Sequence, residues 1–296
     1  MKKRVYSKYD AGKAFTYSLF LPEILVFCFA LISLIIASSQ NLAYEDLIQK
    51  YWFLAITVLL SPVAFLITFL TINKKSNINW KASTGISFKL STKNVLLCIL
   101  ISVLSLVGLN FFVDLFDVLI AKTGFVGAYE LPFPLDSFGW LMFYIVCIAL
   151  LPAVFEEIIF RGIIFNGLKD YGIKTAIFGS AALFMLTHGG IEQMVYPFIL
   201  GIILALVYHN TGNIIYSMIV HFCNNALVVI LNFLMTKYNV VLNIEYTWWF
   251  VLAIIFAAII SVYIIVAFIV KALKKQEVVI EKEKLMSILS ILNCPI

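Results

Sequence analysis

Long apolar runs dominate this sequence and leave few folds open to it. Several runs reach the roughly 20 residues that a helix needs to cross the hydrocarbon core of a bilayer, at about 1.5 Å per residue. Of the 296 residues, 63% are hydrophobic and only 12% are charged, whereas roughly a quarter of a soluble domain is charged. The sequence therefore predicts an all-α, polytopic integral membrane protein with a single membrane domain.

Eight apolar runs predict about eight transmembrane helices around a buried polar site. The first begins after a basic N-terminus and is too long for a signal peptide, so we interpret it as an uncleaved span. The fifth and sixth runs are short, and Gly189-Gly190 between them predicts a helix end covered by protein or facing water. The predicted spans are 14–38, 51–72, 94–121, 138–168, 173–188, 194–208, 213–235 and 247–271.

The distribution of basic residues predicts the orientation of the chain in the membrane. Lysines are concentrated in the segments that follow spans two, four and eight, and these segments share a side with the basic N-terminus. The positive-inside rule then places both termini in the cytoplasm, and we expect a plasma-membrane location. We divide the chain into a cytoplasmic basic N-terminus (1–13), N-terminal transmembrane helices (14–130), a transmembrane core (131–271) and a cytoplasmic tail (272–296).

Composition argues against several classes of site. The net charge of +5 comes from residues beside the spans rather than from a compact basic module, so we expect no nucleic-acid partner. The five cysteines show no CxxC spacing, which argues against a disulfide framework or a zinc ribbon. The lipid bilayer is the expected environment, and the oligomeric state is left open.

Ionisable side chains inside spans are the strongest pointers to function. Each costs a few kcal/mol to insert, so such residues face a protein interior and often mark a functional site. Three segments hold nearly all of them, each on a different predicted span. These are Glu156-Glu157 with Arg161 in span four, Phe184 with His188 at the end of span five, and His221 with Asn225 in span seven.

Spacing along the helices predicts that these groups meet. Spans four and five form a hairpin near residues 170–172, and Glu156 and His188 each lie roughly 21 to 26 Å along their helices from that turn. Span seven enters from the same side, which places His221 about 14 Å and Asn225 about 20 Å from its start. The side chains can therefore converge on one buried level.

The residue types suggest a division of roles for peptide hydrolysis, which needs a base to activate water and donors for the oxyanion. Glu157 and Arg161 stand four residues apart and are predicted to form a structural ion pair, with Phe184 as a further supporting residue. We expect Glu156 to be the general base and His188 to position the water. His221 and Asn225, again four residues apart, are the expected oxyanion-stabilising pair.

The patterns EExxxR, FxxxH and HxxxN, in this order on successive spans, resemble the three motifs of the CPBP family, which includes type II CAAX prenyl endopeptidases and bacterial Abi proteins. The similarity covers about residues 150–229 and makes 131–271 the CPBP-like catalytic core. The resemblance implies an eight-helix fold whose Glu and His residues hydrolyse peptide bonds within the bilayer. It also leaves two mechanisms open: a zinc site made by Glu156, His188 and His221, or a metal-free glutamate mechanism.

The leading hypothesis is an intramembrane CAAX-type endopeptidase that admits a lipidated or hydrophobic peptide laterally and cleaves it by activated water. The first alternative is a catalytically silent relative that acts as a membrane scaffold or bacteriocin-immunity factor. A transporter whose buried polar residues form a substrate path is the third hypothesis.

Overall fold

The computed structural model describes residues 6–41, 43–48, 50–76, 78–124, 135, 137–238, 249, 252–253, 255–267 and 270–271. The secondary structure in this part of the chain is entirely helical. It includes five helices that are long and apolar enough to cross a membrane, and three shorter apolar helices. The predicted all-α, polytopic membrane fold is therefore confirmed. The predicted tail, 272–296, lies outside the described residues.

The observed helices follow the predicted spans closely. Span four is one continuous helix, Phe138–Tyr171, but its helix type changes along its length. The segments η1 and η2 are π-helical, and η3 at its end is a 3₁₀ turn. Another 3₁₀ turn, η4, lies between α9 and α10. The elements are α1 (Lys8–Ser39), α2 (Tyr44–Ile48), α3 (Tyr51–Ser76), α4 (Trp80–Thr84), α5 (Thr92–Ala121), α6 (Phe138–Tyr144), η1 (Ile145–Leu150), α7 (Leu151–Glu157), η2 (Ile158–Phe165), α8 (Asn166–Leu168), η3 (Lys169–Tyr171), α9 (Ile173–Leu186), η4 (Ile191–Gln193), α10 (Val195–Thr211) and α11 (Ile214–Lys237), followed by an apolar helix at Ile255–Ala267.

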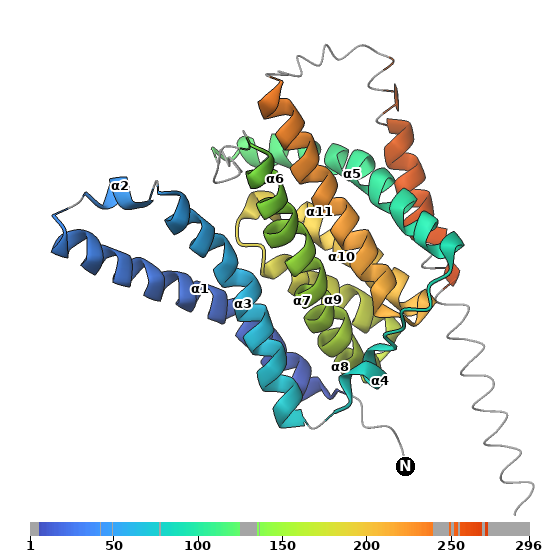
Figure 1. Cartoon of the computed structure of the whole chain (residues 1–296). Helices are drawn as coiled ribbons and strands as arrows, with labels where there is room; N and C mark the ends of the chain where they lie inside the picture. The colour runs from blue at the N-terminus through green and yellow to red at the C-terminus, as the bar shows by residue number, and fades with distance from the viewer. Residues whose placement is uncertain are drawn as a thin grey trace, which may run out of the picture.

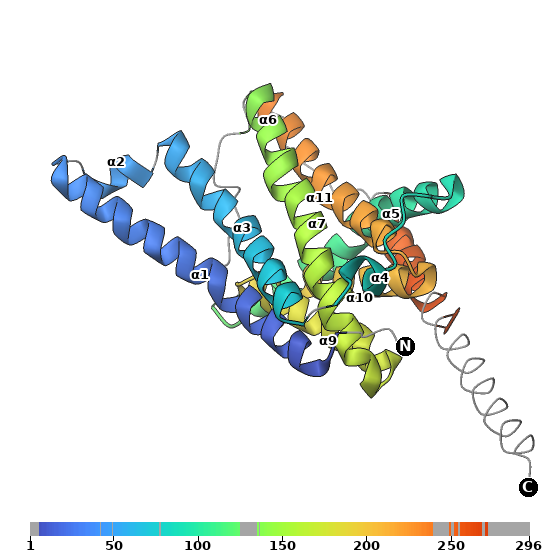
Figure 2. The same cartoon turned by 60° about the horizontal axis from the view of Figure 1, so that its bottom comes forward.

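The helix Phe138–Tyr171 forms the centre of the bundle. Figure 1 shows it beside α11, with the α1–α3 pair on one side and α5 on the other, and Figure 2 shows the same order after rotation. Every residue of η2 is buried, because α1, α3, α9, α10 and α11 all pack against it. Any polar group in this part of the chain is therefore removed from both lipid and bulk water.

The two predicted interruptions are present. The turn between spans four and five lies at η3 and Gly172, where φ is +100°. The helix α9 ends at Leu186, and Gly189 adopts a φ of +84°, a left-handed conformation that glycine enters without steric cost. This early end matters for the site, because it places His188 just beyond the helix rather than within it.

The start of α11 is fixed by hydrogen bonds to the segment that follows α4. Asn213 caps α11 by accepting from the backbone N–H of Ile215 at 3.1 Å. The same side chain accepts from the N–H of Ser87 at 3.2 Å and donates to its carbonyl oxygen at 2.8 Å. Both backbone groups of Ser87 are thus satisfied, and the start of α11 is held at a fixed depth.

Candidate active site

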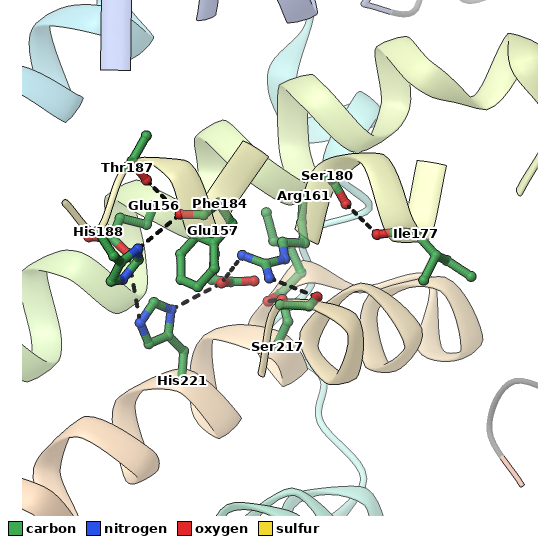
Figure 3. A network of polar contacts seen from close by, with 12 residues as sticks. Glu156, Glu157, Arg161, Ile177, Ser180, Phe184, Thr187, His188, Ser217 and His221 are labelled. Carbon is green, nitrogen blue, oxygen red and sulfur yellow. Dashed lines mark hydrogen bonds and ion pairs between the residues drawn. The ribbon is translucent and has the colours of Figure 1, made fainter. Parts of the chain in front are cut away.

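Three elements bring the predicted polar residues together. Glu156 and Glu157 end α7, His188 follows α9, and His221 lies in the second turn of α11. Figure 3 shows these side chains converging on one network that also contains Arg161 and Phe184. The arrangement agrees with the depths predicted from helix spacing, so the three motifs form one cluster.

The centre of the network is the ion pair between Glu157 and Arg161, both fully buried. Nη1 of Arg161 donates to Oε1 of Glu157 at 2.8 Å, and Nη2 donates to the carbonyl oxygen of Gly201 at 3.0 Å. A glycine is needed there, because a Cβ at position 201 would lie 3.0 Å from the backbone of Ala181. The predicted pair is present, and it also joins the central helix to α10.

His221 lies between the two glutamates. Its Nδ1 is 3.0 Å from Oε1 of Glu157, and its Nε2 is 3.8 Å from Oε2 of Glu156. Because Glu157 is already paired with a guanidinium, its carboxylate is an acceptor and Nδ1 is the donor. The ring is 2% exposed, so Glu157 fixes its orientation and Nε2 is directed toward Glu156.

His188 is held by the backbone of its own motif. Its Nδ1 lies 2.9 Å from the carbonyl oxygen of Phe184. Since a carbonyl oxygen only accepts, Nδ1 carries the proton, and Nε2 of the neutral ring is left as an acceptor. Unlike His221, His188 is only partly buried, and Figure 3 places it beside Glu156.

Phe184 packs against the other members of the cluster. Its ring centroid lies 4.5 Å from that of His188 and 5.8 Å from that of His221, in edge-on geometry. The guanidinium carbon of Arg161 lies 4.7 Å from the same centroid. One aromatic ring therefore excludes water from the ion pair and fixes both imidazoles, as expected of a supporting residue.

Glu157 is paired with the guanidinium of Arg161, whereas Glu156 makes no such ion pair with an arginine in the described part of the chain. The Oε2 atom of Glu156 is buried and, like Oε2 of Glu157, has no hydrogen-bond partner among the described residues. The 3.8 Å to Nε2 of His221 is too long for a direct hydrogen bond, and a water can contact both groups across such a distance. A buried oxygen without a partner costs free energy, so its retention calls for a functional explanation.

Asn225 is the predicted site residue that is least closely joined to the others. Its Nδ2 donates to the carbonyl oxygen of Ile148 at 3.1 Å, which fixes α11 to the π-helical segment η1. An amide nitrogen carries two hydrogens, so one N–H remains for another acceptor. The geometry thus combines a structural contact with a donor that could still serve an oxyanion.

The sequence analysis did not predict a polar contact between α10 and α11 near the site. The hydroxyl of Tyr196, in the first turn of α10, donates to Oδ1 of Asn224 at 2.8 Å, and Asn224 is 1% exposed. This contact connects the segment after His188 to α11. The only sequence signal was the Asn-Asn pair at 224–225, since a tyrosine at the start of a span is also common at a membrane interface.

The predicted zinc ligands agree only in part with a metal site. Both histidines have Nδ1 held by an oxygen, which is how metal-bound histidines are commonly oriented. However, within the described part of the chain no three side chains of His, Cys, Asp or Glu are grouped closely enough to hold a metal ion. The donor set of Glu156, His188 and His221 therefore does not fit a three-ligand zinc centre, and we derive no step through a metal.

Comparison with known proteins gives a match that coincides with this cluster. Residues 138–227 match the family model described as type II CAAX prenyl endopeptidase Rce1-like. The matched segment begins at the first residue of α6 and ends shortly after Asn225, and so contains all three motifs. No curated protein and no solved structure matches the chain.

Proposed function

We propose that this chain, whose residues 138–227 match the CAAX-protease family model, is an intramembrane endopeptidase that hydrolyses a peptide bond in a lipidated or hydrophobic peptide substrate. The observation that carries this proposal is the buried, unpartnered Oε2 of Glu156 beside two oriented imidazoles. This oxygen lies where it could activate a water. The residues around it include both hydrogen-bond donors and hydrogen-bond acceptors.

The first step of the proposed reaction is attack by water on the scissile carbonyl carbon. The water donates one hydrogen bond to Glu156 and the other to Nε2 of His188, which directs an oxygen lone pair at the carbonyl. As the new C–O bond forms, Glu156 accepts the proton and the carbonyl oxygen gains negative charge. His188 acts as an acceptor here, because its own proton is bound to the carbonyl of Phe184.

Stabilisation of the oxyanion is assigned to Nε2 of His221 and the second N–H of Asn225. Since Nδ1 of His221 donates to Glu157, Nε2 can donate only when the ring carries both protons. Formal charges favour this state: Glu156, Glu157 and Arg161 sum to −1, and one proton on His221 brings the buried cluster to zero. A neutral cluster is the least costly one to keep within a bilayer.

Collapse of the tetrahedral intermediate completes the reaction. The C–N bond breaks as Glu156 returns its proton to the leaving nitrogen, which releases an amine and a carboxylic acid and regenerates the base. No further proton donor is required. Placement of this chemistry in the plasma membrane, with both termini in the cytoplasm, follows from the lysine distribution and belongs to the same proposal.

The proposal can be tested against its alternatives with purified full-length protein in lipid vesicles. We expect wild type to cleave a lipidated or strongly hydrophobic fluorogenic peptide, and His188→Ala to do so about 10² to 10⁴ times more slowly, because it loses the acceptor that orients the water. If the protein is a scaffold, neither wild type nor His188→Ala will cleave the peptide. A transporter would instead move the intact peptide across the vesicle membrane, which flux measurements on the same vesicles would detect.

Treatment with a chelator tests whether cleavage requires a bound metal ion. Because the three donors are not close enough together to hold a metal ion, we expect the purified protein to retain most of its rate after treatment with a strong chelator, and to contain much less than one metal per chain by elemental analysis. A known zinc peptidase treated in parallel provides the control. Loss of activity that zinc restores would contradict the glutamate mechanism and would assign Glu156, His188 and His221 as ligands.

A further inference from the structure

One carboxylate outside the candidate active site also lies within an apolar span, far from the site in the sequence. Glu23 is the only charged residue between Lys13 and Glu45. In α1 it lies about 14 Å from Ala14 and about 22 Å from Ser38 along the helix axis, well inside the apolar run. A carboxylate at that depth costs a few kcal/mol unless a partner compensates it.

Glu23 faces outward from the bundle. The buried residues of α1 are all small, and none lies between Ser18 and Ser33. Glu23 itself is exposed, and its neighbours on the same face, Phe20 and Phe27, are 56% and 62% exposed. Figure 1 shows α1 at the edge of the molecule, so this face meets lipid or another protein.

No compensating group within the described part of the chain reaches Glu23, which has neither a hydrogen bond nor an ion pair there. The exposed stripe has the spacing of a helix-packing seam, since Phe20, Glu23 and Phe27 are separated by three and four residues. A single polar residue in such a seam fixes register and partner choice. Within membranes, polar side chains also hydrogen-bond neighbouring helices.

We propose that the outward face of α1 around Glu23 binds a transmembrane helix of another protein that carries a lysine or arginine within its span. The positive charge that would pair with Glu23 must come from another protein. Arg161 is the only lysine or arginine deep within any span of this chain, and it is fully buried on Glu157 and Gly201. A second copy would therefore present only apolar side chains or another Glu23.

The test uses full-length protein in neutral phosphatidylcholine vesicles with a photoreactive residue in place of the exposed Phe27. Two synthetic transmembrane helices, identical except for lysine or leucine at the centre, are the probes. We expect the lysine helix to crosslink about five times more than the leucine helix, as an intramembrane polar contact of about 1 kcal/mol would give. In Glu23→Gln this preference should fall below about twofold.

Charge reversal provides the sharper control. In Glu23→Lys, a probe with a central glutamate should crosslink better than the lysine probe, because the complementary charges have exchanged places. Leu31→Gln, a polar substitution on the same exposed face two turns away, should keep the wild-type preference. Equal crosslinking of both probes to wild type would overturn the proposal, as would crosslinking between two copies of this chain that displaces the lysine probe.

Discussion

Glu156→Gln should reduce the rate of peptide cleavage by about 10³-fold, within the range measured for loss of a general base. Glutamine keeps the size of the side chain and one carbonyl oxygen, so it can still contact a water beside His221. It cannot take the proton that leaves this water. The effect should appear in kcat with little change in KM, because the lost interaction exists only in the transition state.

The chain offers a matched control for this substitution. Glu23→Gln removes another intramembrane carboxylate and makes the same chemical change, but on the outer face of α1. Cleavage by that variant should equal wild type when no partner helix is present. If Glu156→Gln retains more than about a tenth of the wild-type kcat, Glu156 is not the base. Comparable melting temperatures of both variants in detergent would show that folding is not the cause.

The positions of the spans followed from the sequence because apolar length is a strong local signal. The ends at Gly172 and Gly189 were also predictable, since glycine leaves a helix at no steric cost. The convergence of Glu156, His188 and His221 was predicted from the rise per residue, the turn at residues 170–172 and the side from which span seven begins. Each of these signals depends on residues close to one another in the chain.

Other features of the site depend on contacts between distant segments, and sequence patterns do not encode such contacts. The π-helical stretches η1 and η2 are flanked by ordinary α-helix and contain the same apolar residue types. η1 is contacted by a distant amide, since Asn225 donates to the carbonyl oxygen of Ile148 at 3.1 Å. η2 packs against α1, α9 and α10, which come from other parts of the chain. Likewise, the motif spacing predicted that His221 would pair with Asn225, and did not predict that Glu157 orients its ring.

Arg161→Met should lower the free energy of unfolding by about 3–5 kcal/mol, the typical cost of removing one partner from a buried ion pair. The substitution leaves the carboxyl group of Glu157 fully buried and without its guanidinium. It also leaves the carbonyl of Gly201 without a donor. The change can be measured by denaturant titration of the purified protein in mixed micelles. Lys174→Met, which removes an exposed cation at the start of α9, should have an effect below about 0.5 kcal/mol.

A double variant separates the charge effect from the loss of packing. Glu157→Gln removes the carboxylate charge, so in Glu157→Gln/Arg161→Met no uncompensated ion remains at this position, and more than half of the lost stability should return. Its glutamine oxygen can still accept from Nδ1 of His221, but a neutral amide is a weaker acceptor than a carboxylate and orients the ring less firmly. Cleavage should therefore stay below wild type while stability recovers. Additive losses of stability in the double variant would instead show that Arg161 acts mainly by packing on Phe184 and not by neutralising Glu157.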